Sequence, residues 1–331
     1  MIPPGETTGP EVTRGFVDTN GIRMHVAQCG SGPLVVLCHG FPESWYSWRH
    51  QLLALAHAGF HAVALDMRGY GQTDQPKSVD QYTLLHSIGD MVGLLDVLSA
   101  DRAVIAGHDW GAAVAWYASL LRPDRFRAVI ALSLPFLPRL AERPTSLMPQ
   151  NEEEIFYQLY FQRVGIAEAE LQRDVPTTLR RLLFTASGDV PEGISYRGHL
   201  TMVPRRGGLL THTNDPDSLP GWLSSLDLDF YAGVFTRTGF RGGLNWYRNI
   251  DRNWELLASL RGATIRVPAL YVVGDRDLVL TFPGMGELVR NLSMLVPALR
   301  ETVVLPGCGH WTQQERAFEV SQAMASFLRE L

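Results

Sequence analysis

The chain has 331 residues, of which 46% are hydrophobic and 19% charged, a composition typical of a globular protein and not of a disordered or fibrous one. Its formal net charge of −5, without a basic block or a basic–aromatic stripe, argues against a nucleic-acid partner. No apolar stretch approaches the roughly 20 residues that span a bilayer, and the first ten residues lack the basic and apolar regions of a signal peptide.

Short apolar runs alternate with helical patterns in the first part of the chain. Residues 1–14 are polar and are predicted to form a poorly ordered arm. The pair Asn20-Gly21 between two alternating runs predicts a hairpin of residues 16–19 and 22–27. Leucine, isoleucine and methionine at helical spacing predict a helix over residues 84–98. Four further apolar runs predict buried strands at residues 34–38, 61–65, 103–106 and 128–132.

The pattern changes after about Pro135. Prolines interrupt the next segment, which is aromatic and helical in character, with few β-type runs up to about residue 255. Strand-like runs resume at residues 267–273 and 303–305, and a terminal helix is predicted over residues 315–331. This order predicts an α/β fold with a mostly parallel central sheet flanked by helices. We expect a discontinuous core of residues 1–137 and 263–331, with residues 138–262 inserted as a largely helical cap.

The most informative motif is Gly107-His108-Asp109-Trp110-Gly111. It joins a predicted strand to a helix of small and apolar residues, and the two glycines allow a very tight turn around Asp109. A residue at such a turn is held at an exposed point that faces a helix N-terminus. Asp109 is therefore the candidate nucleophile, although an aspartate after a strand can also be a simple helix N-cap.

An aspartate at this position changes the chemistry that the motif supports. The motif usually carries serine, whose hydroxyl is a poor nucleophile until a base removes its proton. A carboxylate, with an ordinary pKa of about 3.9, is already ionised at neutral pH, and the peptide dipoles of the helix N-terminus favour its charge. Asp109 can therefore displace a leaving group from a saturated carbon and form an ester on the enzyme.

An ordered set of motifs resembles the epoxide hydrolases of the α/β-hydrolase fold. The set runs in family order from about residue 16 to the C-terminus, and the order is far more specific than any one motif. The matching motifs are His-Gly-Phe-Pro-Glu at 39–43 with residues 44–49, and residues 66–71, 107–111, 157–162, 239–249 and 309–311. The resemblance implies the α/β-hydrolase fold and hydrolysis of an epoxide to a vicinal diol. It suggests the bacterial type, without the N-terminal phosphatase domain of the mammalian soluble enzymes.

Hydrolysis of such an ester requires a base for water and an acid that orients the base. Enzymes of this fold carry these groups in the chain order nucleophile, acid, histidine. Of the ten histidines, only His310 follows the last predicted strand, and its neighbouring glycines suggest a flexible loop that brings the ring over Asp109. A neutral imidazole suits this role, although an ordinary loop histidine would look the same. The family pattern matches the acid to Asp277 and leaves Asp275 to shape the turn or pair with an arginine.

The resemblance also implies an oxyanion hole for the second step. Water attack on the ester develops negative charge on oxygen, which backbone N–H groups can stabilise. Trp110, the residue after the nucleophile, would supply one N–H and Phe41 the other. The family pattern suggests a cis bond between Phe41 and Pro42, and Glu43 has no assigned role.

Ring opening requires a proton donor for the epoxide oxygen. The resemblance assigns this role to Tyr157 and Tyr247 in the cap, because tyrosine, with a pKa of about 10, stays protonated at neutral pH. Tyr160 lies three residues after Tyr157 and is the alternative. From residue type alone, each tyrosine could simply pack in the cap.

The remaining expectations concern the pocket and the partners. Four residues are predicted to shape the substrate pocket, although packing explains each equally well: His39, Pro42, Trp45 and Trp246. The aromatic cap favours a small apolar epoxide as substrate, with water as the second reactant. Three distant cysteines give no zinc or disulfide spacing, so we expect reduced thiols, no metal and no cofactor. We expect a cytoplasmic protein that is a monomer or a homodimer.

Two other functions stay open at this point. A haloalkane dehalogenase uses the same aspartyl ester, but its halide needs no proton, and dehalogenases typically have a polar or indole donor where this chain has Phe41. A non-catalytic ligand-binding protein on the same fold can dispense with one or more catalytic groups, whereas each has a candidate here. The pair Tyr157 and Tyr247 favours an epoxide as the substrate.

Overall fold

An eight-stranded sheet forms the centre of the computed structural model, which describes residues 10–191 and 201–331. Its strands are β1 (Thr13–Thr19), β2 (Ile22–Cys29), β3 (Leu34–Cys38), β4 (His61–Leu65), β5 (Ala103–His108), β6 (Phe126–Leu132), β9 (Ala269–Gly274) and β10 (Leu299–Leu305). They follow the order β1-β2-β4-β3-β5-β6-β9-β10. β2 is antiparallel to β1 and β4, and all other neighbours are parallel. The predicted α/β fold with a mostly parallel sheet is confirmed.

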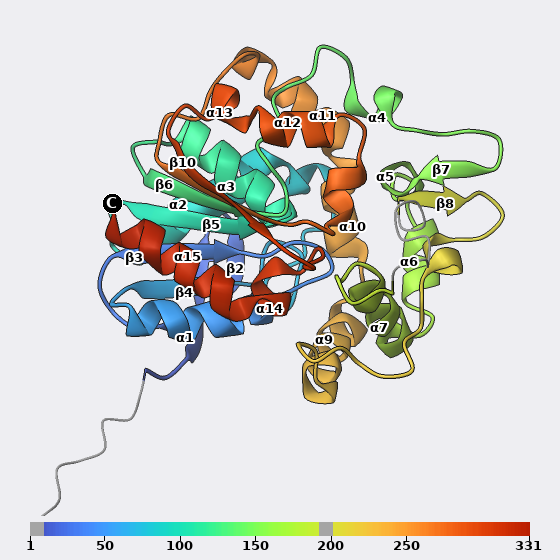
Figure 1. Cartoon of the computed structure of the whole chain (residues 1–331), viewed down its shortest axis with the longest axis horizontal. Coiled ribbons are helices and arrows are strands. Elements are labelled where there is room, and N and C mark those ends of the chain that lie inside the picture. Colours follow the sequence, from blue (N-terminus) through green and yellow to red (C-terminus); the bar gives the residue numbers. More distant parts are fainter. Residues whose placement is uncertain (1–9, 192–200) are drawn as a thin grey trace, which may run out of the picture.

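Helices cover both faces of this sheet. Side chains of β3 alternate between the two layers: Val35 and Leu37 pack with α1 (Arg49–His57) and α15 (Ala317–Arg329). Val36 and Cys38 pack toward α2 (Leu84–Val97) and α3 (Trp110–Leu121). Burial on both faces explains why this strand is a continuous apolar run and not an alternating one. Figure 1 shows α1 and α15 on one side of the sheet, and α3, α12 (Met285–Arg290) and α13 (Leu292–Leu295) on the other.

The segment between β6 and β9 gathers mostly at one end of the sheet (Figure 1). The helices described in this segment are α4 (Pro144–Leu147), α5 (Tyr157–Tyr160), α6 (Ile166–Leu171), α7 (Val175–Thr185), α9 (Ser225–Thr238), α10 (Arg241–Arg248) and α11 (Ile250–Leu256). A short antiparallel pair that the sequence pattern does not predict, β7 (Glu154–Phe156) with β8 (Met202–Pro204), accompanies them. We propose residues 138–262 as the cap, and residues 1–137 with 263–331 as the core.

The remaining elements are single turns: η1 (Trp45–Trp48), η2 (Val79–Tyr82), η3 (Leu209–His212), η4 (Ala258–Leu260), η5 (Leu278–Thr281) and α14 (Thr312–Glu315). Several predicted boundaries differ from those in the structure. β1 begins at Thr13, inside the expected arm, and β10 begins four residues before the expected strand, because both are edge strands with many exposed side chains. The terminal helix is divided at Arg316 into α14 and α15. Within the described ranges, no helix has both the length and the apolar character needed to cross a membrane.

Candidate active site

Asp109 lies in the turn between β5 and α3, with φ 52° and ψ −119°. A Cβ atom on Gly107 would collide with the carbonyl of Gly111, and one on Gly111 would collide with the carbonyls of Cys38 and His39. Glycine is therefore required on both sides for the strand, the turn and the neighbouring loop to lie this close. Asp109 occupies the N-cap position of α3, but its side chain makes no capping hydrogen bond. The carboxylate lines a cavity instead, so the N-cap alternative does not hold.

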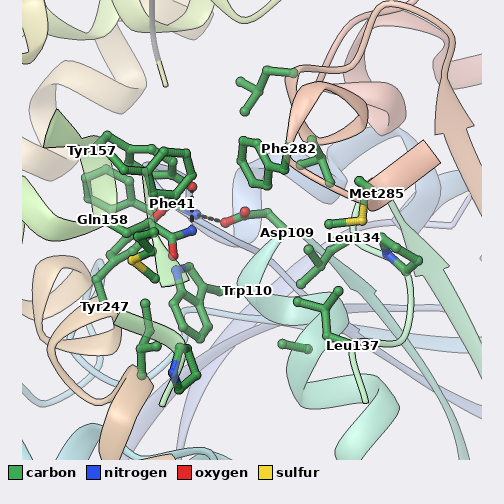
Figure 2. A pocket seen from close by; sticks show the side chains of 18 of the residues that line it. Phe41, Asp109, Trp110, Leu134, Leu137, Tyr157, Gln158, Tyr247, Phe282 and Met285 are labelled. Carbon is green, nitrogen blue, oxygen red and sulfur yellow. Dashed lines mark hydrogen bonds between the residues drawn. The ribbon is translucent and has the colours of Figure 1, made fainter. Parts of the chain in front are cut away.

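Backbone N–H groups hold the Asp109 carboxylate. The Phe41 N–H donates to Oδ1 of Asp109 at 3.0 Å (Figure 2), and the peptide bond between Phe41 and Pro42 is cis, as the resemblance implies. Burial raises the pKa of Asp109, while the charge of His310 and the N–H groups of Phe41 and Trp110 act in the opposite direction. Both N–H groups expected in the oxyanion hole therefore act on this one carboxylate.

His310 lies between two carboxylates. Its Nε2 is 3.9 Å from Oδ2 of Asp109, and its Nδ1 is 3.0 Å from Oδ1 of Asp277. Asp277 is almost fully buried. Asp275, in contrast, accepts the N–H of Gly307 at 2.7 Å and shapes the turn. The structure thus brings Asp109, His310 and Asp277 together and leaves Asp275 outside.

Protonation of His310 differs from the sequence-based expectation. Burial lowers its pKa, but Asp277, Asp109 and Glu43 outweigh this effect and raise the pKa to about 9. Burial acts to raise the pKa of Asp277, but the nearby His310 ring outweighs this effect, and the pKa of Asp277 is lowered overall. At neutral pH the ring is therefore mainly protonated in the enzyme without substrate, where a neutral imidazole is expected from the sequence.

The loop that carries His310 packs tightly, which corrects the expected flexibility. A Cβ atom on Gly309 would collide with backbone atoms of Ala186, Ser187 and Gly188, which belong to the cap segment after α7. The N–H of His310 also donates to the carbonyl of Ala186 at 2.8 Å. Glycine at 309 thus permits close backbone packing between the core loop and the cap.

Two tyrosines face Asp109 from the cap. Tyr157 begins α5 and Tyr247 lies in α10, and their ring centroids are 5.8 Å apart. Both line the cavity on the side facing the Asp109 carboxylate (Figure 2). Burial and the charge of Asp109 raise the pKa of both hydroxyls above the ordinary tyrosine value, so both stay protonated at neutral pH. The alternative, Tyr160, donates its hydroxyl to Glu170 at 2.8 Å and is not a lining residue.

Each of these tyrosine oxygens accepts a hydrogen bond from a neighbour. The Gln158 amide donates to the Tyr157 oxygen at 2.9 Å. The side chain of Trp110, whose indole N–H can only donate, bonds to Tyr247. The two hydroxyls also interact with each other, because a hydrogen bond with Tyr247 acts to lower the pKa of Tyr157. Nothing in the sequence pattern marks Gln158 for this role.

Glu43, which has no role predicted from sequence, connects three loops behind the site. Its Oε2 accepts the N–H of Gly40 at 2.8 Å and lies 2.7 Å from Nδ1 of His108. Its Oε1 accepts the side-chain amide of Gln313 at 2.8 Å. Burial acts to raise the pKa of Glu43, but His108 outweighs it and holds the pKa at about 2. Nε2 of His108 lies 2.7 Å from the carbonyl of His310. This one buried carboxylate therefore links the loop of Gly40, the end of β5 at His108 and the loop of His310.

Ser133 is a second residue that the sequence does not mark. Its Oγ lies 3.0 Å from Nδ1 of His310, and its backbone has φ 69°. The hydroxyl of Tyr271 donates to its carbonyl at 2.7 Å. Ser133 directly follows β6, and chemistry in parallel sheets gathers at the carboxyl ends of strands. This rule is the sequence-level signal that could have identified Ser133 as a residue of the site.

A cavity of about 640 Å³ joins these groups, and its walls are mainly apolar. Leu134, Phe282 and Met285 line it opposite the tyrosines (Figure 2). The cavity suits an apolar substrate, whose burial against such walls is favourable. Among the residues that the structure describes, no group of histidine, cysteine and acidic side chains is arranged to hold a metal ion.

Only one of the four predicted pocket residues lines this cavity, namely Pro42. Nε2 of His39 accepts the N–H of Met67 at 3.0 Å. The indole of Trp246 donates to the carbonyl of Arg68 at 3.0 Å, and the ring of Trp45 packs against aromatic neighbours. These three side chains brace the loops behind the cavity, because their polar atoms or rings are already engaged there.

A sheet of this topology, with an acidic elbow residue and an acid and a histidine after its last strands, defines the α/β-hydrolase class. The model of the alpha/beta hydrolase fold family matches residues 33–317. The chain is 48% identical to Epoxide hydrolase A of Mycobacterium tuberculosis over 319 residues, covering 96% of this chain and 97% of that protein. It is 44% identical to Epoxide hydrolase 2 of Siraitia grosvenorii over 320 residues, covering 95% and 97%. A solved epoxide hydrolase from an endophytic Streptomyces has a TM-score of 0.92 at 42% identity, covering 96% and 95%. The chain therefore belongs to the epoxide hydrolases of the α/β-hydrolase fold.

Proposed function

We propose that the chain hydrolyses epoxides through an ester formed on Asp109, which water activated by His310 then cleaves to give the vicinal diol. The observation that supports this best is the position of the Asp109 carboxylate. It lines the cavity with two tyrosine hydroxyls on the cap side and the His310 ring 3.9 Å away on the core side. A carboxylate needs no proton removal before it attacks carbon.

In the first step, an oxygen of Asp109 bonds to an epoxide carbon while that carbon's bond to the ring oxygen breaks. The electron pair moves to the ring oxygen, which accepts hydrogen bonds from Tyr157 and Tyr247 and takes a proton from one of them. The tyrosinate later regains a proton from solvent. Because both hydroxyls have raised pKa values, they reach the reaction protonated and ready to donate.

In the second step, His310 removes a proton from water, which attacks the carbonyl carbon of the ester. The N–H groups of Phe41 and Trp110, which act on the carboxylate before reaction, stabilise the oxyanion. Asp277 holds the ring of His310 and stabilises its charged form. The bond between Cγ of Asp109 and the ester oxygen then breaks, the protonated His310 gives its proton to the departing alkoxide, and the diol leaves with one oxygen that came from the enzyme.

A single turnover in heavy-oxygen water tests this mechanism. With enzyme in excess over substrate, the diol should contain ordinary oxygen in the first turnover, and Asp109 should acquire the label, as read by mass spectrometry of the peptide that contains it. Repeated turnover should then release labelled diol. Direct incorporation of solvent oxygen into the diol in the first turnover would rule out the ester.

Removal of either tyrosine hydroxyl should slow the first step. Tyr157→Phe and Tyr247→Phe are each expected to lower the rate of ester formation by about 10²-fold, the low end for loss of a general acid. Tyr160→Phe is the matched control, since its hydroxyl bonds to Glu170 away from the cavity. Stopped-flow measurement of the alkylation rate checks all three variants, and equal rates in all of them would contradict the assignment.

The pKa of His310 should change during the catalytic cycle. The charge of Asp109 helps to raise this pKa to about 9 in the enzyme without substrate, and ester formation removes that charge. The pKa should therefore fall, so that the ring loses its proton and becomes a base. We expect the rate of ester hydrolysis to increase with pH around a midpoint below that of the free enzyme. Asp109→Asn, which also removes the charge, should lower the pKa of His310 in an NMR titration, and an unchanged pKa would contradict this coupling.

A further inference from the structure

Glu315, the last residue of α14, contacts the loop of His310 on both sides. Its Oε2 accepts the N–H of Gly309 at 2.8 Å, and its Oε1 accepts the N–H of Trp311 at 2.9 Å. The same Oε2 accepts the N–H of Gly188 in the cap at 2.8 Å. One carboxylate thus bonds the residues directly before and after His310 and joins both to the cap.

We propose that Glu315 is a positioning residue for His310. It holds the imidazole in the position from which the ring activates the water that attacks the Asp109 ester. It acts through the backbone, since its hydrogen bonds go to the neighbours of His310 and not to the ring. The inference rests on the proposed function, because it concerns the second step of that mechanism.

The cap segment that follows α7 completes this clamp. A Cβ atom on Gly188 would collide with the backbone of Gly307 and Gly309, so the cap and the loop meet backbone to backbone. The guanidinium of Arg276, the residue before Asp277, donates to the carbonyl of Gly188. The cap segment therefore contacts the loops of both the base and its orienting acid, and Glu315 joins the base loop to it.

The chemistry of the carboxylate suits this position. All three partners are N–H donors, and an ionised carboxylate offers only acceptors. Burial, with Asp189, raises the pKa of Glu315 to about 7 although the three N–H groups act to lower it, so the ionised carboxylate that accepts all three bonds is the main form above about pH 7. A glutamine here would replace one acceptor oxygen with an NH₂ group, so at least one of the three N–H groups would lose its partner.

The test separates the two chemical steps in the full-length protein. Glu315→Gln should slow ester hydrolysis by about 10- to 100-fold and alter ester formation by less than about twofold, because a displacement on the order of 1 Å can cost about 10²-fold in rate. The ester on Asp109 should therefore accumulate, as detected by mass spectrometry. Glu315→Asp, which keeps two acceptor oxygens, should recover part of the hydrolysis rate. Glu319→Gln, the same change at an exposed site in α15, should leave both rates unchanged.

A reference variant, His310→Gln, distinguishes failure of this inference from failure of the proposed function. If His310→Gln accumulates no ester, the ester mechanism itself is wrong. If His310→Gln accumulates ester, but Glu315→Gln slows both steps equally or slows neither step, the positioning role is overturned. Should Glu315→Gln fail to fold, Glu315→Asp carries the same comparison, and an ester hydrolysis rate equal to that of the unaltered protein overturns the role.

Discussion

Asp109→Ala is expected to abolish epoxide hydrolysis, with a loss in kcat/KM of about 10⁴-fold or more, as when the nucleophile of a catalytic triad is removed. Among the residues that the structure describes, no other acidic side chain lines the cavity, and the second carboxylate of the site, Asp277, is buried behind His310. Steady-state assay of diol formation measures the loss. Activity within tenfold of the unaltered protein, on the order of 1.4 kcal/mol in barrier, would remove Asp109 from the mechanism.

Stability provides the control for this variant. Burial raises the pKa of Asp109, so the folded state disfavours its charged form relative to the unfolded chain. Above the folded-state pKa this disfavoured charge reduces stability, and its removal at neutral pH should not lower the Tm. We expect Asp109→Ala to unfold at the same temperature as the unaltered protein or higher, as often found when a strained functional group is removed. A lower Tm would assign the loss of activity at least partly to misfolding.

The interior of the fold follows from the sequence, whereas its edges do not. The runs at residues 34–38 and 61–65 match β3 and β4 at both ends, because strands buried on two faces must be apolar throughout. β10 pairs on one side only, and several of its side chains face solvent. The polar residues Arg300, Glu301 and Thr302 near its start therefore carry no apolar signal. The three-residue strands β7 and β8 are too short for any alternation to be visible.

The candidate site also contains residues that the sequence reveals and residues that it does not. Asp109 can be found from sequence because its requirements are local: glycines two residues away on each side and a strand before it. His310 can be found from its place after the last strand. Glu43 and Glu315 cannot, because their roles arise from contacts with loops that only the folded chain brings together. The pKa of His310 likewise cannot be predicted from the sequence, because it depends on carboxylates from three different segments.

His310→Gln is expected to stop the reaction at the ester. Asp109 and both tyrosines are unchanged, so ester formation should continue, while hydrolysis slows by about 10²- to 10⁴-fold for loss of the general base. Loss of the His310 charge removes an interaction that lowers the pKa of Asp109, so ester formation should be fastest at higher pH than before. Mass spectrometry should detect one substrate mass added to the enzyme. Rapid-quench assays should detect consumption of about one epoxide per enzyme without diol, as expected for an accumulating covalent intermediate.

Asp277→Asn is the comparison that separates the base from the residue that orients it. This variant keeps the imidazole of His310 but removes the carboxylate that does most to raise its pKa, so the ring becomes a weaker base that still lies near the ester. Hydrolysis should slow less than in His310→Gln, and its pH midpoint should move down. If neither variant accumulates ester and both lose ester formation equally, the histidine acts on the epoxide step itself. Water would then attack the epoxide directly, and Asp109 would serve as an electrostatic partner of His310 and not as the nucleophile.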